Sequence, residues 1–405
     1  MGGICRLFRP RYYMALTVAW ISFFPIEWLD DVSEELRNLP KVHPATWQRV
    51  LLGELEKCNE LKLHVFVLRK HFKKSEQFVR NGVTFHLIKT YGGLRASSFY
   101  WLDTVLLRKE LAAIEPDLVH AWGTEGGAAL VAGRLGYPCL VTCQGLLNWI
   151  RQSVPLNAYD RFHALLEDIS LGGARTVTTE SKFSVGYLRK RYPQLDVHQV
   201  EHAPLGLFSE LKRAPVREKL RILFVGGLNY LKGGDVMLRS LDSLVDELDF
   251  ELICVGNVDK PFFEKIRPCL SDAFQRRVHL VGSRTATEIA GELSKATWML
   301  YPTRCDNSPN AVKEAAVAGV PVIASNVGGI IDYIWPGENG LLFEAGSVAG
   351  CAKAVRQAAS HALFSCGQVN ELALRRVRDY LSKERMAWEF MQLYYSVSGN
   401  SGHSR

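Results

Sequence analysis

The chain has 405 residues, of which 47% are hydrophobic and 22% are charged, and its net charge is +7 at pH 7. This length exceeds one ordinary hydrophobic core and predicts at least two domains of a soluble globular protein. The nine cysteines are scattered and form no paired CxxC arrangement, so a structural zinc site and a disulfide-stapled fold are both disfavoured. Reduced thiols in a cytosol are therefore expected.

The N-terminal segment resembles the start of a secretory signal, because three arginines precede an apolar run from Tyr12 to Ile26. The run is too short to span a bilayer, and Phe23 to Trp28 offers no small-residue cleavage site. We therefore predict a buried strand from Met14 to Ile21, with the basic segment on the surface. The tail from Gly399 to Arg405 is expected to be disordered.

The first half of the chain alternates apolar strands with helical stretches, which predicts a parallel sheet covered by helices. Further strands are predicted at His64–Leu68, Thr84–Ile88, Leu118–Ala121, Leu140–Thr142 and Thr176–Thr179, and helices at Ala45–Lys57, Trp101–Ile114 and Gly126–Arg134. A segment from Leu205 to Lys219 with two prolines nearby is interpreted as a linker. The pattern then repeats, with strands at Arg221–Val225, Phe250–Val255, Val278–Val281, Trp298–Tyr301 and Pro321–Ala324, and the last helix is predicted at Lys383–Val397.

A loop rich in glycine follows the strand that begins the second half. Gly226 and Gly227 allow the backbone to approach a phosphate closely, and Lys232 supplies a mobile positive charge. The spacing matches neither the dinucleotide fingerprint nor a Walker loop. Taken alone, the glycine pair would be a structural turn and Lys232 a surface lysine.

The stretch from Tyr301 to Tyr333 predicts a strand, a loop, a helix and a second strand. Ser308 is the predicted N-cap, Pro309 the first helical residue, and Gly319 the C-terminal cap candidate. The start of such a helix attracts an anionic phosphate, because its first N–H groups have no partner inside the helix. Asp306 precedes that start and Glu314 lies about 9 Å along the helix at ~1.5 Å per residue. Carboxylates on both sides of a phosphate site suit a nucleotide sugar.

These residues resemble a known family. The acidic-x7-Glu spacing of Asp306 and Glu314, the following GVPVIAS-NVGG-I stretch and the FVG-x5-KG loop are similar to family 4 of the retaining GT-B glycosyltransferases. The resemblance implies that Glu314 holds the ribose hydroxyls, that Asp306 lies near the transferred sugar and that Lys232 clamps the donor diphosphate. It further implies backbone contacts to sugar and phosphate from Asn307, Ser308, Asn310 and Ala311.

The chain departs from the family pattern at several positions. Gly226 is kept, but Gly227 stands where the family has an arginine, and Arg284 is our candidate for the missing charge. In the first half, the segment containing His120 resembles the family's DVVHAH, with Trp122 in place of the second histidine. Gln144 replaces the histidine of a T-x-H-G turn. We predict that His120, Trp122, Glu125 and Gln144 are acceptor-binding, although burial explains His120 better.

The resemblance implies two Rossmann-like doubly wound parallel-sheet domains that face a cleft, an α/β architecture called the GT-B fold. The predicted limits are an acceptor-binding domain at 1–205, a linker at 206–219, a donor-binding domain at 220–380, and a C-terminal helix with its tail at 381–405. That helix is expected to cross back to the first domain.

The predicted function is hexosyl transfer from a nucleoside diphosphate sugar to a saccharide or lipid-linked acceptor, with no cofactor and no metal. Bacterial surface polysaccharide assembly is the expected setting. A sugar-nucleotide epimerase and a degenerate, non-catalytic nucleotide-sugar-binding protein remain alternatives. The positive net charge suits either a solvated surface or a peripheral contact with an anionic membrane. We expect a cytoplasmic protein, with such a contact on the inner face of the plasma membrane as one alternative. No nucleic-acid partner is expected.

Overall fold

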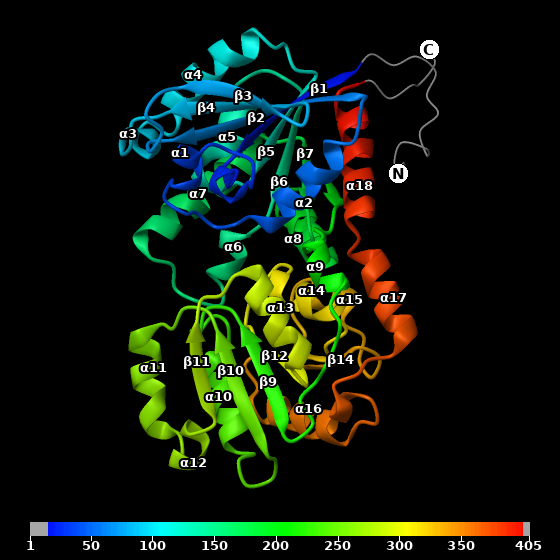
Figure 1. Ribbon diagram of the computed structural model, residues 1–405. Helices are drawn as coiled ribbons and strands as arrows, with labels where there is room; N and C mark the ends of the chain where they lie inside the picture. The colour runs from blue at the N-terminus through cyan, green and yellow to red at the C-terminus, as the bar shows by residue number, and fades with distance from the viewer. Residues whose placement is uncertain (1–14, 400–405) are drawn as a thin grey trace. The chain divides into compact units, whose positions relative to one another are not determined.

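The computed structural model describes residues 15–399, which fold into two compact units (Figure 1). The first unit contains residues 15–180, 184–203 and 383–399, and the second contains residues 181–183 and 204–382. Met14, the arginines before it and the tail beyond Gly399 lie outside the described residues. Within the described part, none of the helices has both the length and the apolar character needed to cross a bilayer.

The first unit is built on an eight-stranded sheet in the order β3-β4-β2-β1-β5-β6-β7-β8, and only the β3–β4 pair is antiparallel. Its strands are β1 Leu16–Ser22, β2 Leu61–Arg69, β3 Glu76–Arg80, β4 Val83–Lys89, β5 Leu118–Trp122, β6 Cys139–Cys143, β7 Thr176–Thr179 and β8 Asp196–Gln199. Its helices are η1 Ile26–Trp28, α1 Glu34–Arg37, α2 Thr46–Leu55, α3 Leu94–Ser97, α4 Trp101–Ala112, η2 Glu125–Gly127, α5 Ala128–Gly133, α6 Leu147–Ile150, α7 Ala158–Gly173, α8 Lys182–Arg191, whose first two residues belong to the second unit, and α18 Lys383–Val397.

The second unit has a six-stranded parallel sheet in the order β11-β10-β9-β12-β13-β14. Its strands are β9 Leu220–Val225, β10 Phe250–Val255, β11 Val278–Gly282, β12 Trp298–Tyr301, β13 Val322–Ser325 and β14 Gly340–Phe343. Its helices are α9 Gly206–Ser209, α10 Gly234–Asp242, α11 Lys260–Ile266, η3 Arg267–Cys269, α12 Asp272–Gln275, α13 Ala286–Lys295, α14 Asn310–Val317, α15 Ile330–Tyr333, α16 Val348–Ser360, η4 Phe364–Cys366 and α17 Glu371–Tyr380.

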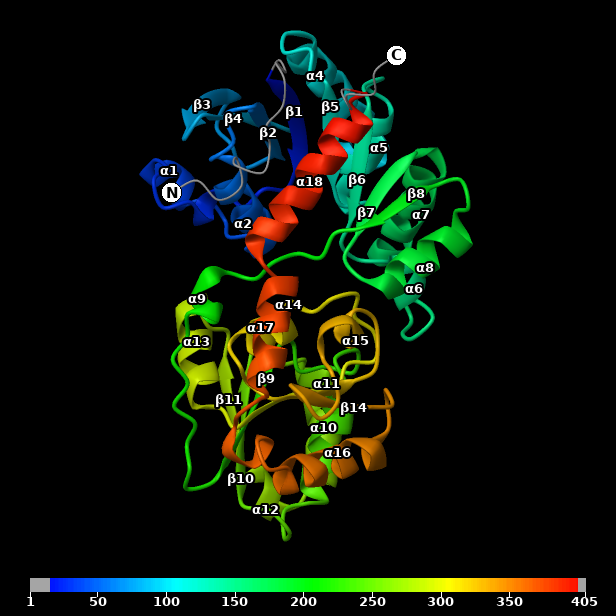
Figure 2. The ribbon, with the colours of Figure 1, turned by 90° about the vertical axis from the view of Figure 1, so that its right-hand side faces the viewer.

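The last helix, α18, packs on the first unit beside α2, as Figure 2 shows. Phe390 and Tyr394 are fully buried there, and the Tyr394 hydroxyl accepts a hydrogen bond from Trp20 Nε1 at 2.9 Å. The return of the chain to its first sheet, together with one largely parallel and one parallel sheet covered by helices, confirms the predicted GT-B fold.

Two sequence expectations need correction. The predicted helix from Gly126 to Arg134 is broken, because Gly126 and Gly127 have φ of 69° and 83° and separate η2 from α5. A Cβ at either glycine would collide with the ring of Phe23 or of Tyr100, so close packing replaces the first helical turn. The segment interpreted as a linker, 206–219, begins with α9 and is part of the second unit, where Arg213 donates to backbone carbonyls of α13 and of Gly367.

Candidate functional site

The helix expected to receive a phosphate is α14, which begins after the loop that follows β12. Pro309 is its N-cap, with extended backbone angles, and its carbonyl accepts the first bonds from Val312 and Lys313. The prediction of Ser308 as the N-cap and Pro309 as the first helical residue was wrong, because Pro309 is itself the N-cap; the Ser308 hydroxyl lies 3.4 Å from that of Tyr333. The backbone N–H groups of Asn310 and Ala311 lie in the first turn, where no carbonyl inside the helix can accept from them. Gly319, with φ of 75°, follows the end of the helix as expected.

Lys232, in the loop after β9, forms a contact with Asp306, in the loop before α14. The Lys232 ammonium forms an ion pair with Asp306 Oδ2, and the same oxygen accepts the Tyr301 hydroxyl at 2.9 Å. Burial alone would lower the pKa of Lys232, but the neighbouring Asp306 and Tyr301 outweigh it and leave the pKa raised. Burial and the Asp306 carboxylate raise the pKa of Tyr301 as well. The site therefore holds a permanent cation beside a phenol that keeps its proton.

Glu314 lies on α14 in a different environment from Asp306. Its side chain is buried, with 9% of its surface exposed, and no described residue forms a hydrogen bond or ion pair with its carboxylate. Burial raises its pKa from 4.5 to about 8, and only neighbouring Lys313 opposes that rise. A buried carboxyl group without a partner is costly, so it is expected where a ligand supplies hydrogen-bond donors.

The glycine-rich loop is packed against the loop that carries Asp306. A Cβ at Gly233 would collide with the Pro302 carbonyl, and one at Gly256 would collide with the backbone of Gly226, whose φ is 150°. Gly227 differs from these residues, because its φ is not in the left-handed region and a Cβ there would lie 3.1 Å from Asn229 Nδ2. A side chain at Gly227 therefore needs no change of backbone conformation, but the Asn229 amide group must move by a few tenths of an ångström.

Two arginines of the second unit are candidates to replace the missing charge. Arg284 is partly exposed and pairs with Glu288 at 3.5 Å within the first turn of α13. Arg304 lies in the same loop as Asp306, with its guanidinium 3.7 Å from the Tyr230 ring centre and paired to Asp235 at 2.6 Å. Sequence reasoning missed Arg304, although its position two residues before Asp306 was a usable signal.

A short piece of the first half completes this loop. The Ser181 hydroxyl donates to Asn307 Oδ1 at 2.7 Å, and the Asp332 carboxylate accepts from the Lys182 backbone N–H at 2.9 Å. A Cβ at Gly328 would collide with the Asp306 carbonyl. The glycines after β13 are thus needed for close packing on the Asp306 loop, and Ser181 is a second neighbour that the sequence did not identify.

His120 and Trp122, two of the predicted acceptor residues, lie in the core of the first unit. His120 is completely buried, with Nδ1 2.8 Å from the Tyr394 hydroxyl and Nε2 2.7 Å from the Thr142 hydroxyl. Burial also lowers its pKa well below the usual value, so it is neutral. Trp122 is 2% exposed and packs against the His120 and Phe390 rings. This placement corrects their assignment as acceptor-binding residues, because both rings are enclosed by protein.

Glu125 and Gln144 are better placed for an acceptor, since both are half-buried and follow the carboxyl ends of β5 and β6. The two Glu125 carboxylate oxygens lie over Gly123 and Gly145, where a Cβ would come within 2.9 Å of each. Burial raises the pKa of Glu125, partly opposed by backbone N–H groups. Burial also raises the pKa of the neighbouring Glu167 to about 7, although Asn148 and Leu147 donate to it.

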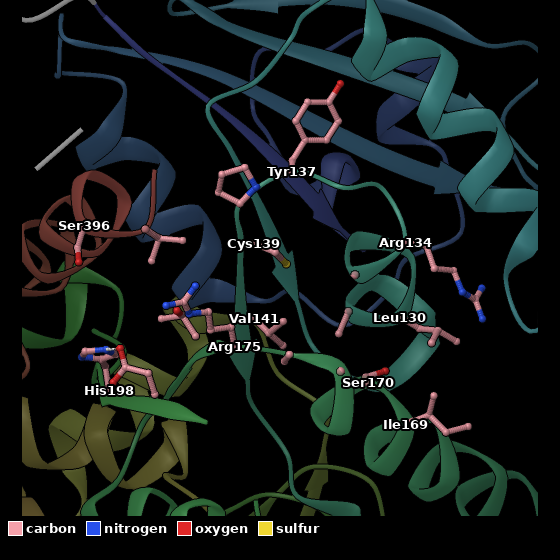
Figure 3. A pocket seen from close by; sticks show the side chains of 18 residues that line it. Leu130, Arg134, Tyr137, Cys139, Val141, Ile169, Ser170, Arg175, His198 and Ser396 are labelled. Carbon is pink, nitrogen blue, oxygen red and sulfur yellow. Dashed lines mark ion pairs between the residues drawn. The ribbon is translucent and has the colours of Figure 1, made fainter. Parts of the chain in front are cut away.

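The first unit also contains a cavity of about 730 Å³ (Figure 3), and Glu125, Gln144 and Glu167 are not among its lining residues. It is lined by the first residues of β6, β7 and β8 and by the ends of α5 and α7, so it opens at the amino edge of the sheet. Glu125 and Gln144 belong to the opposite, carboxyl edge, where ligands bind in open α/β sheets. Among residues 15–399, no group of three or more His, Cys, Asp or Glu side chains is placed to hold a metal ion.

The donor candidates therefore divide into groups by their placement. Two packed loops carry Lys232, Asp306, Asn307 and Ser308. Helix α14 carries Asn310, Ala311 and Glu314. Gly226 and Gly227 begin the first loop, whereas Arg284 lies after β11 with its own ion pair.

Comparison with known proteins agrees with this arrangement. A protein-family model described as Glycosyltransferase Family 4 matches residues 49–207 of this chain. A second family model, described as Glycosyl transferases group 1, matches residues 219–361. A 2-deoxystreptamine N-acetyl-D-glucosaminyltransferase of Niallia circulans is 29% identical over 33% of this chain and 34% of its own. An N-acetyl-alpha-D-glucosaminyl L-malate synthase of Bacillus anthracis is 26% identical over 46% of this chain and 48% of its own.

The chain spans about a third to a half of the length of the curated relatives it matches. Solved structures extend the likeness over nearly the whole fold. Sucrose-phosphate synthase from Thermosynechococcus elongatus covers 95% of this chain and 100% of its own at 18% identity, with a TM-score of 0.76. HepE from Anabaena, in complex with UDP and glucose, covers 94% of this chain and 100% of its own at 13% identity, with a TM-score of 0.67. The chain belongs to glycosyltransferase family 4, the group 1 glycosyl transferases, a retaining family with the GT-B fold.

Proposed function

We propose that the protein transfers a hexosyl group, with retention of configuration and without a metal ion, from a nucleoside diphosphate sugar to a saccharide or glycolipid acceptor. Bacterial surface polysaccharide assembly at the cytoplasmic side of the membrane is the proposed setting. The observation that carries this proposal is the buried Glu314 side chain on α14, in the same strand–loop–helix segment as Asp306, which forms an ion pair with Lys232 of the glycine-rich loop.

The charges suit a diphosphate. Lys232 has three N–H donors and one carboxylate partner, so it can bind a phosphate oxygen while it keeps or exchanges Asp306. The first turn of α14 adds backbone donors and the positive end of the helix dipole. Each well-placed donor stabilises the developing negative charge of the leaving diphosphate by about 3 kcal/mol.

The flanking carboxyl groups suit the two rings of the donor. The ribose hydroxyls would donate to Glu314, which otherwise lacks a partner, and binding would then favour its ionised form. Asp306, held by the Tyr301 hydroxyl, would face the transferred sugar. The leaving diphosphate can itself accept the proton of the incoming acceptor hydroxyl, so no protein base is required on the donor side.

The test is a turnover assay with a panel of nucleoside diphosphate sugars selected first by thermal stabilisation. We expect Lys232→Ala and Glu314→Ala to abolish sugar transfer while the far-UV circular dichroism spectrum stays unchanged. Lys353→Ala, on the exposed face of α16, is the matched control and should keep full activity. Full transfer by either of the first two variants would contradict the donor-site assignment.

Product analysis separates the alternatives. Release of an epimerised free nucleotide sugar, with no acceptor consumed, would identify an epimerase instead. Nucleotide-sugar binding without acceptor-dependent release of nucleoside diphosphate would identify a degenerate binding protein, for which the departures at Gly227, Trp122 and Gln144 provide the argument.

A further inference from the structure

Helix α4 of the first unit turns an apolar face toward solvent. Its inward face carries Asp103 and Thr104, which are bonded to Arg95 and to the Tyr100 carbonyl. Its outward face begins with Trp101, Leu102, Val105 and Leu106, which are 53%, 42%, 62% and 37% exposed. The buried face of α4 already includes Leu107 and Leu111, so the apolar side chains at its exposed start are additional to the core. The described part of the chain leaves these four side chains largely uncovered.

The segment before α4 enlarges this apolar surface. Tyr91, Leu94 and Phe99 are 70%, 58% and 41% exposed, and α3 packs against α4 (Figure 1). The Phe99 ring lies 5.6 Å from that of Phe162 on α7. We call the seven exposed residues Tyr91, Leu94, Phe99, Trp101, Leu102, Val105 and Leu106 the α4 face.

Cations surround the α4 face. The Arg134 guanidinium lies 4.5 Å from the Trp101 ring centre and donates to the Phe99 carbonyl at 2.6 Å, and Arg108 donates to the Arg134 carbonyl. At the other end, the Lys70 side chain lies directly over Gly92. Lys109 is exposed beside Arg108, and Glu110 is the exposed acidic residue of α4.

We propose that the α4 face docks the protein on a bilayer that contains anionic phospholipid. Aromatic and aliphatic side chains with a cationic rim match the boundary between acyl chains and anionic headgroups. A second copy of the chain is a poorer fit, because two such faces would bring their arginine and lysine rims together. A neutral apolar partner would leave the rim without a counter-charge.

The α4 face adjoins the candidate acceptor residue of the same unit. Phe23 packs directly on Gly126 and Tyr100 on Gly127, the two residues that follow Glu125. A lipid-linked acceptor anchored in the docked bilayer would therefore meet Glu125 without leaving the membrane surface. This part rests on the proposed function and specifies its acceptor as lipid-linked rather than free.

The docking is tested by sedimentation with two kinds of vesicle, in the absence of any sugar nucleotide. One kind contains phosphatidylcholine alone, and in the other about 30% of the lipid is phosphatidylglycerol. The wild type is expected to bind the anionic vesicles at least about tenfold more tightly than the neutral ones. The double variant Leu102→Asp/Val105→Asp should lower binding to the anionic vesicles at least about tenfold. Leu372→Asp, at a leucine 73% exposed on α17, is the matched control and should bind as the wild type.

Each outcome has a defined meaning. Equal vesicle binding by the double variant and the wild type overturns the proposal, as does a dimer in lipid-free solution that the double variant dissociates. Lys232→Ala should lose transfer but bind vesicles normally, because its change lies in the second unit. A wild type that docks on the vesicles but transfers no sugar would refute the proposed function and leave the docking surface intact. If the double variant loses transfer to a lipid-linked acceptor but keeps transfer to its water-soluble analogue, the lipid-linked acceptor is supported. Equal losses on both acceptors overturn it.

Discussion

Replacement of Glu314 by glutamine gives a quantitative test of the buried carboxyl group. Glutamine has the same shape but cannot ionise, so the variant removes the cost of burying a charge and little else. The unfolded chain releases the Glu314 proton near pH 4.5, whereas the folded chain holds it until about pH 8. Between these values the folded state binds more protons, so rising pH favours unfolding of the wild type.

The magnitude follows from the pKa shift. A rise from 4.5 to about 8 corresponds to about 5 kcal/mol at ~1.4 kcal/mol per pKa unit, and partial hydration of the carboxylate reduces it to about 2 to 5 kcal/mol. At pH 5 the neutral Glu314 and its glutamine replacement should give nearly equal free energies of unfolding. At pH 9 the variant should be more stable by that amount.

Chemical denaturation of both proteins at pH 5, 7 and 9 measures this difference. Glu264→Gln, at an exposed position on α11, is the matched control and should follow the wild type at every pH. Wild-type and Glu314→Gln curves that stay parallel from pH 5 to pH 9 would refute the reasoning, because the ionised Glu314 would then be as well solvated or paired in the folded chain as in the unfolded one.

Three other changes have defined outcomes. Lys232→Ala should lower kcat for sugar transfer at least about a hundredfold, and a loss below about fivefold in steady-state kinetics would contradict its role on the diphosphate. Gly227→Arg should tighten binding of the nucleoside diphosphate about tenfold in calorimetry, because the backbone there accepts a side chain and a second cation is restored. Weaker binding by Gly227→Arg would show that the glycine is required. Gly226→Ala, where the backbone angle φ would strain any side chain, is expected to weaken binding. Tyr394→Phe should lower the free energy of unfolding by about 1 to 3 kcal/mol, since it removes the hydroxyl between two buried rings, and Tyr395→Phe should have a smaller effect in the same denaturation assay.

The sequence predicted the central strands well because their residues are buried on both faces. Thr176–Thr179, Phe250–Val255 and Trp298–Tyr301 have the predicted bounds, and α18 has those predicted for the last helix. The strands that the sequence analysis missed are β3, β8 and β14, each at one edge of its sheet. β3 and β8 are short and partly polar, so they lack the continuous apolar run by which the others were found. β14 is apolar but has only four residues and begins with Gly340, a residue type that is depleted in strands.

The site was predicted unevenly for a physical reason. The acidic-x7-Glu spacing identifies a local strand–loop–helix unit, so the elements that carry Asp306 and Glu314 followed from the sequence. The partners brought by tertiary packing did not, because nothing local marks Ser181 as a neighbour of Asn307 or Arg304 as the partner of Asp235. The pairing of Asp306 with Lys232 is likewise a contact between loops 74 residues apart.

A structure of the protein bound to a nucleoside diphosphate sugar tests the central claim most directly. We predict the diphosphate at the start of α14, with Lys232 Nζ in hydrogen-bonding distance of a phosphate oxygen and the Glu314 carboxylate accepting both ribose hydroxyls. A donor bound elsewhere, with the Lys232–Asp306 pair undisturbed and Glu314 still without a partner, would contradict the account.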